Sequence, residues 1–179
     1  MTDSSDLWVF AYGSLLWSPG FEAEEAVRAR LEGWRRGFCM WSLHYRGTEA
    51  APGLVLALDE DGGAACEGLA LRVSAGRREE VLEGLRSREL VSDAYQERWL
   101  PVVLRDGRKV TTVTYVVRRD HRQYACVDLD TQARTIAGAR GLRGPNIDYL
   151  TSTAERLADL GIQDPGIEAL LQRTRTMLA

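Results

Sequence analysis

The 179-residue sequence has few of the residues that indicate a metal centre or a disulfide framework. It contains three cysteines and two histidines, and no C-x-x-C pair. Widely spaced cysteines in odd number are typical of reduced thiols, so we expect a cytoplasmic protein with no metal site. The first six residues, Met1 to Asp6, are polar and acidic, and they do not resemble a signal peptide.

The sequence also lacks long apolar runs and an excess of basic residues. No run approaches the roughly 20 apolar residues that span a bilayer, so we expect no membrane association. The formal net charge of −3 gives no general attraction to nucleic acid, and none is expected as a partner. The length and the 45% hydrophobic fraction predict a single domain over residues 1–179, while the number of subunits is not fixed by the sequence.

Several catalytic motifs are missing as well. There is no G-x-G-x-x-G after a strand, no G-x-x-x-x-G-K-[ST] loop and no G-x-S-x-G elbow, which disfavours dinucleotide, nucleoside triphosphate and α/β-hydrolase chemistry. Ser14 as a nucleophile would need a base that the sequence does not identify. A Cys–His pair stays formally open, and it would combine Cys39 or Cys126 with His44 or His121. Small buried cysteines and surface histidines are the favoured interpretation, because the sequence alone does not bring these residues into contact.

The most informative stretch is W-V-F-A-Y-G-S-L-L-W, residues 8–17. Its β-branched and aromatic residues predict a strand that ends abruptly at Gly13 and Ser14. A strand that stops there leaves a short row of backbone N–H groups, which can bind a carboxylate or a carbonyl oxygen. An ordinary turn from strand to loop is the alternative.

Residues 18–117 are predicted to be mainly strands and turns. We expect a loop over residues 18–30, a strand over 31–42 with an interruption near Gly37, and a loop over 44–48. Strands over 53–58 and 66–73 should form a hairpin whose turn is 59–63, and strands 95–104 and 110–117 a second hairpin around Asp106-Gly107. Between the hairpins, Ser74 is a plausible cap for a helix that runs to about Arg88.

The last third of the chain is predicted to be helical. A first helix, capped by Asp130 or Thr131, should end near residue 139. A second should begin with Asn146 as its N-cap and end before Gly161, and a third should begin at Asp164-Pro165. Strands first and helices last predict an α+β domain with a mainly antiparallel or mixed sheet.

Glu89 lies at or just beyond the end of the helix before the second hairpin. A helix C-terminus disfavours a carboxylate, and burial beside Leu90 and Val91 would raise the pKa of Glu89 further. A carboxyl group with a raised pKa suits general acid–base catalysis near neutral pH. A solvated glutamate next to Arg88 is the alternative interpretation.

These features together resemble the ChaC-like γ-glutamylcyclotransferases from Trp8 almost to the end of the chain. Four segments match the family in its order: the opening decapeptide, R-G followed by P-G, the pair R-E, and N-I-D-Y-L. They occupy residues 8–17, 46–47 with 52–53, 88–89, and 146–150.

The resemblance implies a γ-glutamylcyclotransferase-like fold, a small mixed β-barrel with flanking helices. It implies cleavage of glutathione to 5-oxoproline and cysteinylglycine, with no metal or organic cofactor. Glu89 would be the catalytic acid and base. We expect the turn formed by Tyr12, Gly13, Ser14 and Leu15 to bind substrate, together with Arg46 for a substrate carboxylate. Tyr149 is expected to hydrogen-bond the substrate or Glu89, and a packing role at the start of its helix is the alternative.

One segment departs from the family pattern. Eukaryotic members often have R-E-K-x-G-Y, whereas residues 88–95 here read R-E-L-V-S-D-A-Y, which we interpret as bacterial-type variation. Three alternatives therefore stay open: a cyclotransferase for other γ-glutamyl amines or amino acids, a non-enzymatic regulator of cation transport on the same fold, and a cyclising enzyme of antibiotic synthesis.

Overall fold

The computed structural model describes residues 5–179, so most of the polar N-terminal sequence lies outside the described part of the chain. The chain divides into two compact units. The first comprises the residues up to Arg36 together with Leu58–Arg118, and the second comprises Gly37–Ala57 with Arg119–Ala179. Strands β2 (Glu25–Ser42) and β3 (Gly53–Val73) continue from one unit into the other. A single domain over residues 1–179 stays a prediction.

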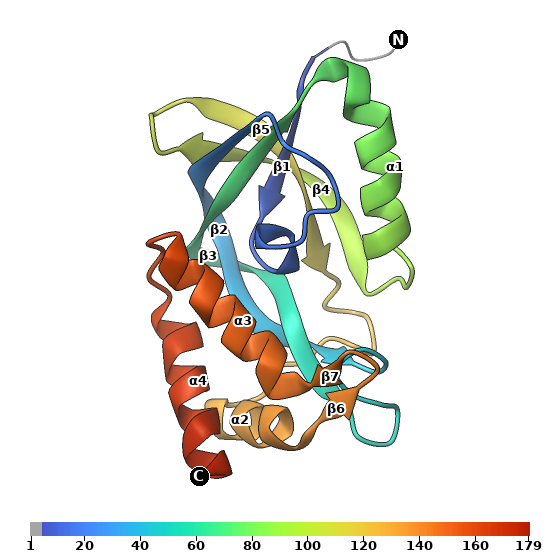
Figure 1. The fold of residues 1–179 in the computed structure, drawn as a ribbon, viewed down its shortest axis with the longest axis vertical. Coiled ribbons are helices and arrows are strands. Elements are labelled where there is room, and N and C mark those ends of the chain that lie inside the picture. Colours follow the sequence, from blue (N-terminus) through green and yellow to red (C-terminus); the bar gives the residue numbers. More distant parts are fainter. Residues whose placement is uncertain (1–4) are drawn as a thin grey trace. The chain divides into compact units, whose positions relative to one another are not determined.

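Five strands form a closed barrel in the order β1-β3-β2-β4-β5 (Figure 1). The three shorter strands are β1 (Leu7–Ala11), β4 (Tyr95–Leu104) and β5 (Lys109–Val117). β1 pairs antiparallel with β3 and parallel with β5, where Val9 lies opposite Val113. β4 and β5 form the predicted antiparallel hairpin, and Gly107 in its turn has φ 93°. The barrel is therefore mixed, as the sequence resemblance implied.

The predicted hairpin turn at residues 59–63 is wrong. β3 passes through these residues as one continuous strand of 21 residues. The turn types favoured in two-residue hairpins need positive φ at one or both central residues, and neither Gly62 nor Gly63 has a positive φ. The loop predicted over residues 18–30 is likewise shorter, because β2 begins at Glu25, and the strand runs through Gly37 without interruption. Its unusual backbone is at Gly33, with φ 83°.

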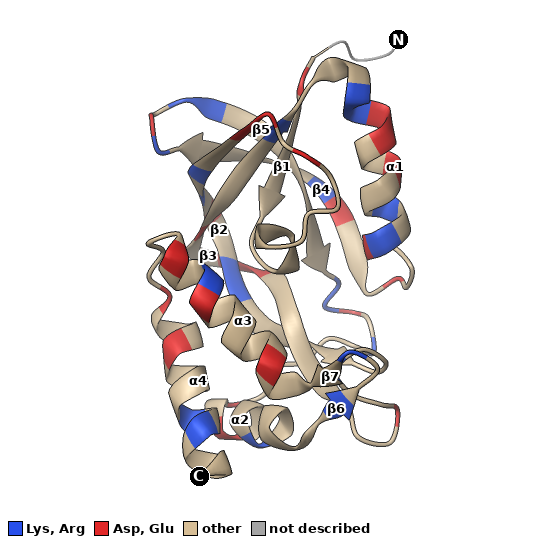
Figure 2. Ribbon diagram, in the orientation of Figure 1, with Lys and Arg blue, Asp and Glu red and all other residues tan. Residues whose placement is uncertain are grey.

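The helix predicted before Glu89 is present and packs along β4 in the first unit. A short 3₁₀ turn, Ala75–Arg77, precedes α1 (Arg78–Glu89), so Ser74 caps the turn rather than the helix and makes no side-chain capping bond. The buried face of α1 consists of Val81, Leu82 and Leu85. Toward β4, Arg78 lies over the Trp99 ring at 5.3 Å and Arg86 pairs with Glu97. Figure 2 shows acidic and basic residues interspersed along α1.

The helical last third is confirmed in the second unit, with changes at two helix starts. The helices are α2 (Leu129–Gly138), α3 (Asn146–Asp159) and α4 (Pro165–Leu178), and the two-residue strands β6 (Arg140–Gly141) and β7 (Gly144–Pro145) precede α3 (Figure 1). Asp164 caps α4 as predicted, accepting a bond from the Ile167 N–H. Asp128, rather than Asp130 or Thr131, caps α2. No helix within residues 5–179 is long and apolar enough to cross a membrane.

Asn146 is not the N-cap of α3 but its first residue, and its side chain bonds elsewhere. Its Oδ1 accepts from the Leu54 N–H and its Nδ2 donates to the Leu54 carbonyl, both at 2.8 Å. Asn146 and Leu54 are both fully buried. A side-chain amide has both a donor and an acceptor, so it can replace a strand neighbour at this point of β3.

Replacing Asn146 by Ala should lower the free energy of unfolding by about 2 to 4 kcal/mol, because two buried backbone groups of Leu54 lose their partners. The shift should appear in urea unfolding. Asp148→Ala, an exposed change two residues along the same helix, serves as the control and should stay within about 0.5 kcal/mol of the wild type. Equal stability of the two variants would contradict this role of Asn146.

Candidate active site

The turn after β1 is held in place by bonds to Tyr12. The Tyr12 hydroxyl donates to the Tyr115 carbonyl at 2.7 Å, and the Tyr12 carbonyl accepts from Arg36 Nη1 at 3.0 Å. The 3₁₀ turn η1 (Ser14–Leu16) follows, closed by a bond from the Leu16 N–H to the Gly13 carbonyl. The first N–H groups of a helical turn have no acceptor within the turn, so those of Ser14 and Leu15 suit the anion-binding role predicted for residues 12–15.

Glu89 is the last residue of α1, and its side chain is only 16% exposed. Burial raises the pKa of Glu89, and the nearby Arg88 guanidinium opposes part of that shift. The predicted direction is therefore confirmed. The predicted cause is only half right, because Leu90 and Val91 are themselves 36% and 82% exposed and do not bury the carboxyl group.

Arg88 connects Glu89 with the turn after β1, and all three groups belong to the first unit. Its Nε lies 3.3 Å from Glu89 Oε1. Its Nη2 donates to Ser14 Oγ at 2.9 Å, and its Nη1 donates to the Ser18 carbonyl. The structure thus brings together two parts of the predicted site that are more than 70 residues apart in sequence.

Tyr115 of β5 is a residue that the sequence analysis did not identify. Its buried hydroxyl donates to Glu97 Oε2 at 3.2 Å, and Glu97 is held by two bonds from Arg86. Burial, together with the negative charges of Glu97 and Glu89, raises the pKa of Tyr115. Tyr115 lies within a continuous buried run of β5, with no motif around it, so no sequence signal distinguished it.

In the second unit, Arg46 and Tyr149 lie together. Arg46 Nη1 donates to the carbonyls of Arg143 and Pro145 at 2.9 and 3.2 Å, and its guanidinium carbon lies 5.7 Å from the centre of the Tyr149 ring. The Tyr149 hydroxyl accepts a bond from the Leu56 N–H at 3.4 Å. These contacts give both residues a structural role at the start of α3, and their contact with substrate stays a prediction.

Close backbone packing explains the R-G and P-G pairs. A Cβ atom on Gly47 would lie 2.0 Å from the Gly53 nitrogen, and one on Gly53 would lie 2.2 Å from the Arg46 carbonyl oxygen. Only glycine fits at such distances. The two pairs, predicted as a family signature, therefore bring the loop after β2 against the start of β3.

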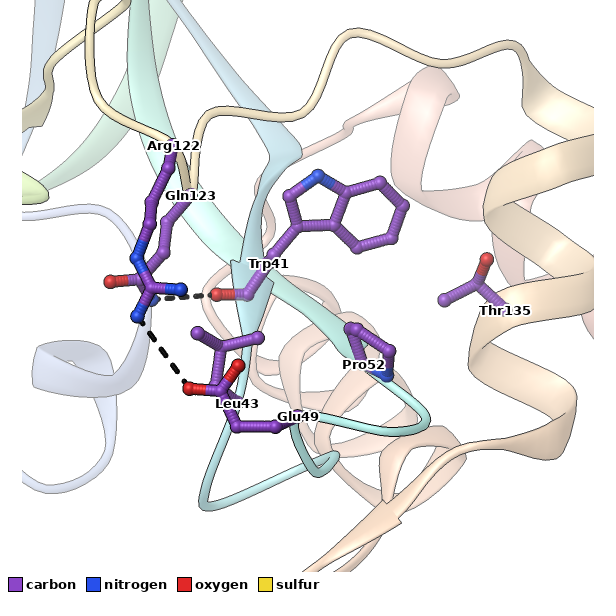
Figure 3. Close-up of a pocket in the computed structure, with 7 residues that line it drawn as sticks. All are labelled: Trp41, Leu43, Glu49, Pro52, Arg122, Gln123 and Thr135. Carbon is purple, nitrogen blue, oxygen red and sulfur yellow. Dashed lines mark hydrogen bonds and ion pairs between the residues drawn. The ribbon is translucent and has the colours of Figure 1, made fainter.

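The second unit also contains a pocket of about 450 Å³ that the sequence analysis did not predict (Figure 3). Three of its polar side chains have partners within the unit: Arg122 lies 3.5 Å from Glu49, and Gln123 donates to the Trp41 carbonyl at 2.9 Å. The lining residues are Trp41, Leu43, Glu49, Pro52, Arg122, Gln123 and Thr135. In residues 5–179, no three His, Cys, Asp or Glu side chains are grouped so that they could hold a metal ion.

The barrel and its helices have the γ-glutamylcyclotransferase fold. The chain superposes on the crystal structure of a γ-glutamyl cyclotransferase specific to glutathione from yeast with a TM-score of 0.86, at 23% identity and over 96% of both chains. The family model for ChaC-like proteins matches residues 7–177. The protein belongs to the ChaC-like family.

Curated relatives support the same assignment over nearly the whole chain. The chain is 36% identical to the glutathione-specific γ-glutamylcyclotransferase of Escherichia coli K12, over 99% of its own length and 76% of that protein. It is 32% identical to glutathione-specific γ-glutamylcyclotransferase 1 of Danio rerio, over 95% of its length and 91% of that protein.

The raised pKa of Glu89 predicts how the stability of the protein depends on pH. Because the folded chain binds this proton more tightly than the unfolded chain, the stabilisation is complete below the unfolded pKa and is lost as pH rises through the folded pKa. Glu89→Gln cannot ionise, so its Tm relative to the wild type should be higher at about pH 8 than at about pH 4.5.

Glu97→Gln is the matched control, with the opposite sign. Hydrogen bonding to Arg86 lowers the pKa of Glu97, so its carboxylate stabilises the fold at pH values above the pKa of the unfolded chain. The Tm of the variant relative to the wild type should therefore be lower at about pH 8 than at about pH 4.5. Thermal unfolding at both pH values measures the two differences. If the Tm of Glu89→Gln relative to the wild type were instead lower at the higher pH, burial would not be the cause that sets the pKa of Glu89.

Proposed function

We propose that the protein is a γ-glutamylcyclotransferase that cleaves glutathione to 5-oxoproline and cysteinylglycine. The observation that carries the proposal is the buried Glu89 with its raised pKa, joined through Arg88 to the turn after β1. Membership of the ChaC-like family, whose matched relatives carry the name glutathione-specific γ-glutamylcyclotransferase, supports the choice of substrate.

The reaction needs little beyond folding the substrate correctly. The α-amino nitrogen of the γ-glutamyl group attacks the γ-carbonyl carbon, a five-membered ring forms, and the amide bond to cysteine breaks. Well-oriented intramolecular reactions reach effective molarities of about 10⁵ M or more. The chemistry requires no redox step, and we propose that no cofactor takes part.

Glu89 carries out both proton transfers in this proposal. The α-ammonium group cannot attack while it is charged, so the Glu89 carboxylate first accepts one of its protons. The Glu89 carboxyl group then gives this proton to the leaving nitrogen as the amide bond breaks, and the regenerated carboxylate carries the second proton of the ring nitrogen to the released amine of cysteinylglycine. The raised pKa of Glu89 lies closer to neutral pH, and a group whose pKa is near the working pH can serve first as a base and then as an acid.

Substrate binding is assigned to two sets of residues. The backbone amides of residues 12–15 hold the α-carboxylate or the oxygen of the γ-carbonyl, where negative charge develops during attack. In the second unit, Arg46 is our candidate for the carboxylate at the glycine end of glutathione, and Tyr149 for a hydrogen bond to the substrate.

The three free cysteines agree with a cytoplasmic enzyme.

Glu89→Gln should lower turnover by at least about 10²- to 10⁴-fold, because glutamine can neither accept nor deliver the proton. The pure wild type and the variant are incubated with glutathione without added metal, and 5-oxoproline and cysteinylglycine are followed by mass spectrometry. Glu83→Gln, an exposed position on the same helix, is the control and should keep wild-type turnover.

The outcomes of this assay separate the alternatives. Product from the wild type and from Glu83→Gln, but not from Glu89→Gln, supports both the reaction and the acid–base residue. Normal turnover by Glu89→Gln would remove Glu89 from the mechanism. No product from the wild type would contradict the proposed substrate, and γ-glutamyl-alanine and γ-glutamyl amines would then distinguish a different cyclotransferase from a non-enzymatic regulator.

Arg46 can be tested through its effect on substrate binding. If Arg46 holds the glycine carboxylate, Arg46→Lys should raise the KM for glutathione about tenfold, since lysine loses the paired geometry. It should leave the KM for γ-glutamyl-cysteine, which lacks that glycine, little changed. An equal rise for both substrates would assign Arg46 to the structure around α3 instead.

A further inference from the structure

The side chain of Arg88 occupies an unusual place between the two parts of the proposed active site. It lies in the last turn of α1, where a cation is already favourable to the helix dipole. That effect needs only the charge and does not require a particular side-chain direction. The guanidinium nevertheless turns toward the chain after β1, 70 and 74 residues earlier in sequence.

Every nitrogen of this guanidinium has a partner in the proposed site. Nε faces the Glu89 carboxylate, Nη2 donates to Ser14 Oγ, and Nη1 donates to the Ser18 carbonyl. The planar fork of arginine can make these three contacts at once, whereas the single ammonium of lysine cannot reproduce their directions.

The two acceptors in the turn also determine its shape. Ser14 is the first residue of η1, and Ser18 closes the turn by donating its own N–H to the Ser14 carbonyl at 2.9 Å. A guanidinium that binds Ser14 and Ser18 together therefore holds both ends of this segment. The backbone N–H groups proposed to bind substrate lie directly at its first end.

We propose that Arg88 is a positioning residue that fixes the turn of residues 13–18 against Glu89, so that the oxyanion-binding amides and the acid–base carboxyl group keep one geometry. The inference rests on the proposed cyclotransferase function for its kinetic consequence. Intramolecular cyclisation is sensitive to this geometry, because the attacking nitrogen and the carbonyl carbon must be aligned while the proton is removed.

Arg88 also influences the charge of Glu89. Arg88 on its own helix and Tyr115 on β5 are coupled electrostatically to Glu89, and the Tyr115 hydroxyl bonds to Glu97 of β4, which is paired with Arg86. Among them Arg88 is the cation in contact with the carboxyl group. Removing its charge should raise the pKa of Glu89 further, so the acid limb of a rate profile should move to higher pH.

Three variants separate geometry from charge. Arg88→Gln removes both, and kcat/KM for glutathione should fall roughly 10- to 100-fold while the acid limb moves up in pH. Arg88→Lys keeps the charge, so the acid limb should stay in place while kcat/KM still falls several-fold. Arg175→Gln removes an exposed arginine from the last turn of α4, in the second unit, and should match the wild type.

A double-mutant cycle identifies the partner. Because Arg88 acts through the serine hydroxyl, Ser14→Ala and Arg88→Gln together should lose about as much kcat/KM as Arg88→Gln alone. Fully additive losses, or wild-type kinetics in both Arg88 variants, would overturn the proposal. If Arg88→Gln does not fold, as judged by its thermal unfolding, the same cycle is measured with Arg88→Lys.

Amide hydrogen exchange tests the positioning role without any substrate. In Arg88→Gln the N–H groups of Leu16 and Ser18, which close the turn, should exchange faster, while those of β4 stay protected. Unchanged exchange would overturn the proposal. Absence of 5-oxoproline from the wild type, with faster exchange in the variant, would instead contradict the proposed function and leave the structural role of Arg88 supported.

Discussion

Closure of the barrel at β1 is the constraint on which the rest of the structure depends. β1 pairs with β3 along all five of its residues and meets β5 where Val9 lies opposite Val113. Both valines are fully buried, so a shift of one residue would turn their side chains out of the core. The point at which the chain leaves the barrel is thereby fixed, and the turn that follows Tyr12 begins at one defined position.

The proposed chemistry depends on a second consequence of this arrangement. α1 lies along β4 through Arg78 and Arg86, which places its C-terminal end, with Glu89, beside the turn after β1. The carboxyl group is buried without a strong compensating network, whereas Glu97 nearby is held by two bonds from Arg86. The two glutamates consequently have pKa shifts of opposite sign, because burial dominates at Glu89 and hydrogen bonding to Arg86 dominates at Glu97.

Much of the fold could be predicted from short-range patterns, and the exceptions have a common cause. The dipeptide Asp-Gly occurs twice as a predicted hairpin signal: at Asp106-Gly107 it forms the turn, and at Asp61-Gly62 it lies inside a continuous strand. The dipeptide is the same at both positions, so it does not decide between turn and strand, whereas the pairing of β3 with its neighbours does. Asn146 shows the same effect, since a residue well suited to an N-cap instead bonds to Leu54, 92 residues away.

By itself, the sequence determined which residues are available: a strand that ends at Gly13-Ser14, a glutamate at the end of a helix, and the four segments of the ChaC-like family. These features follow from propensity, capping and glycine conformation, which act over a few residues. Only the tertiary structure decided that Arg88 reaches Ser14 and Ser18, that Glu89 is buried although Leu90 and Val91 are exposed, and that Tyr115 lies beside it. Burial and long-range hydrogen bonds depend on which distant segments the closed barrel brings together, and local sequence patterns do not contain that information.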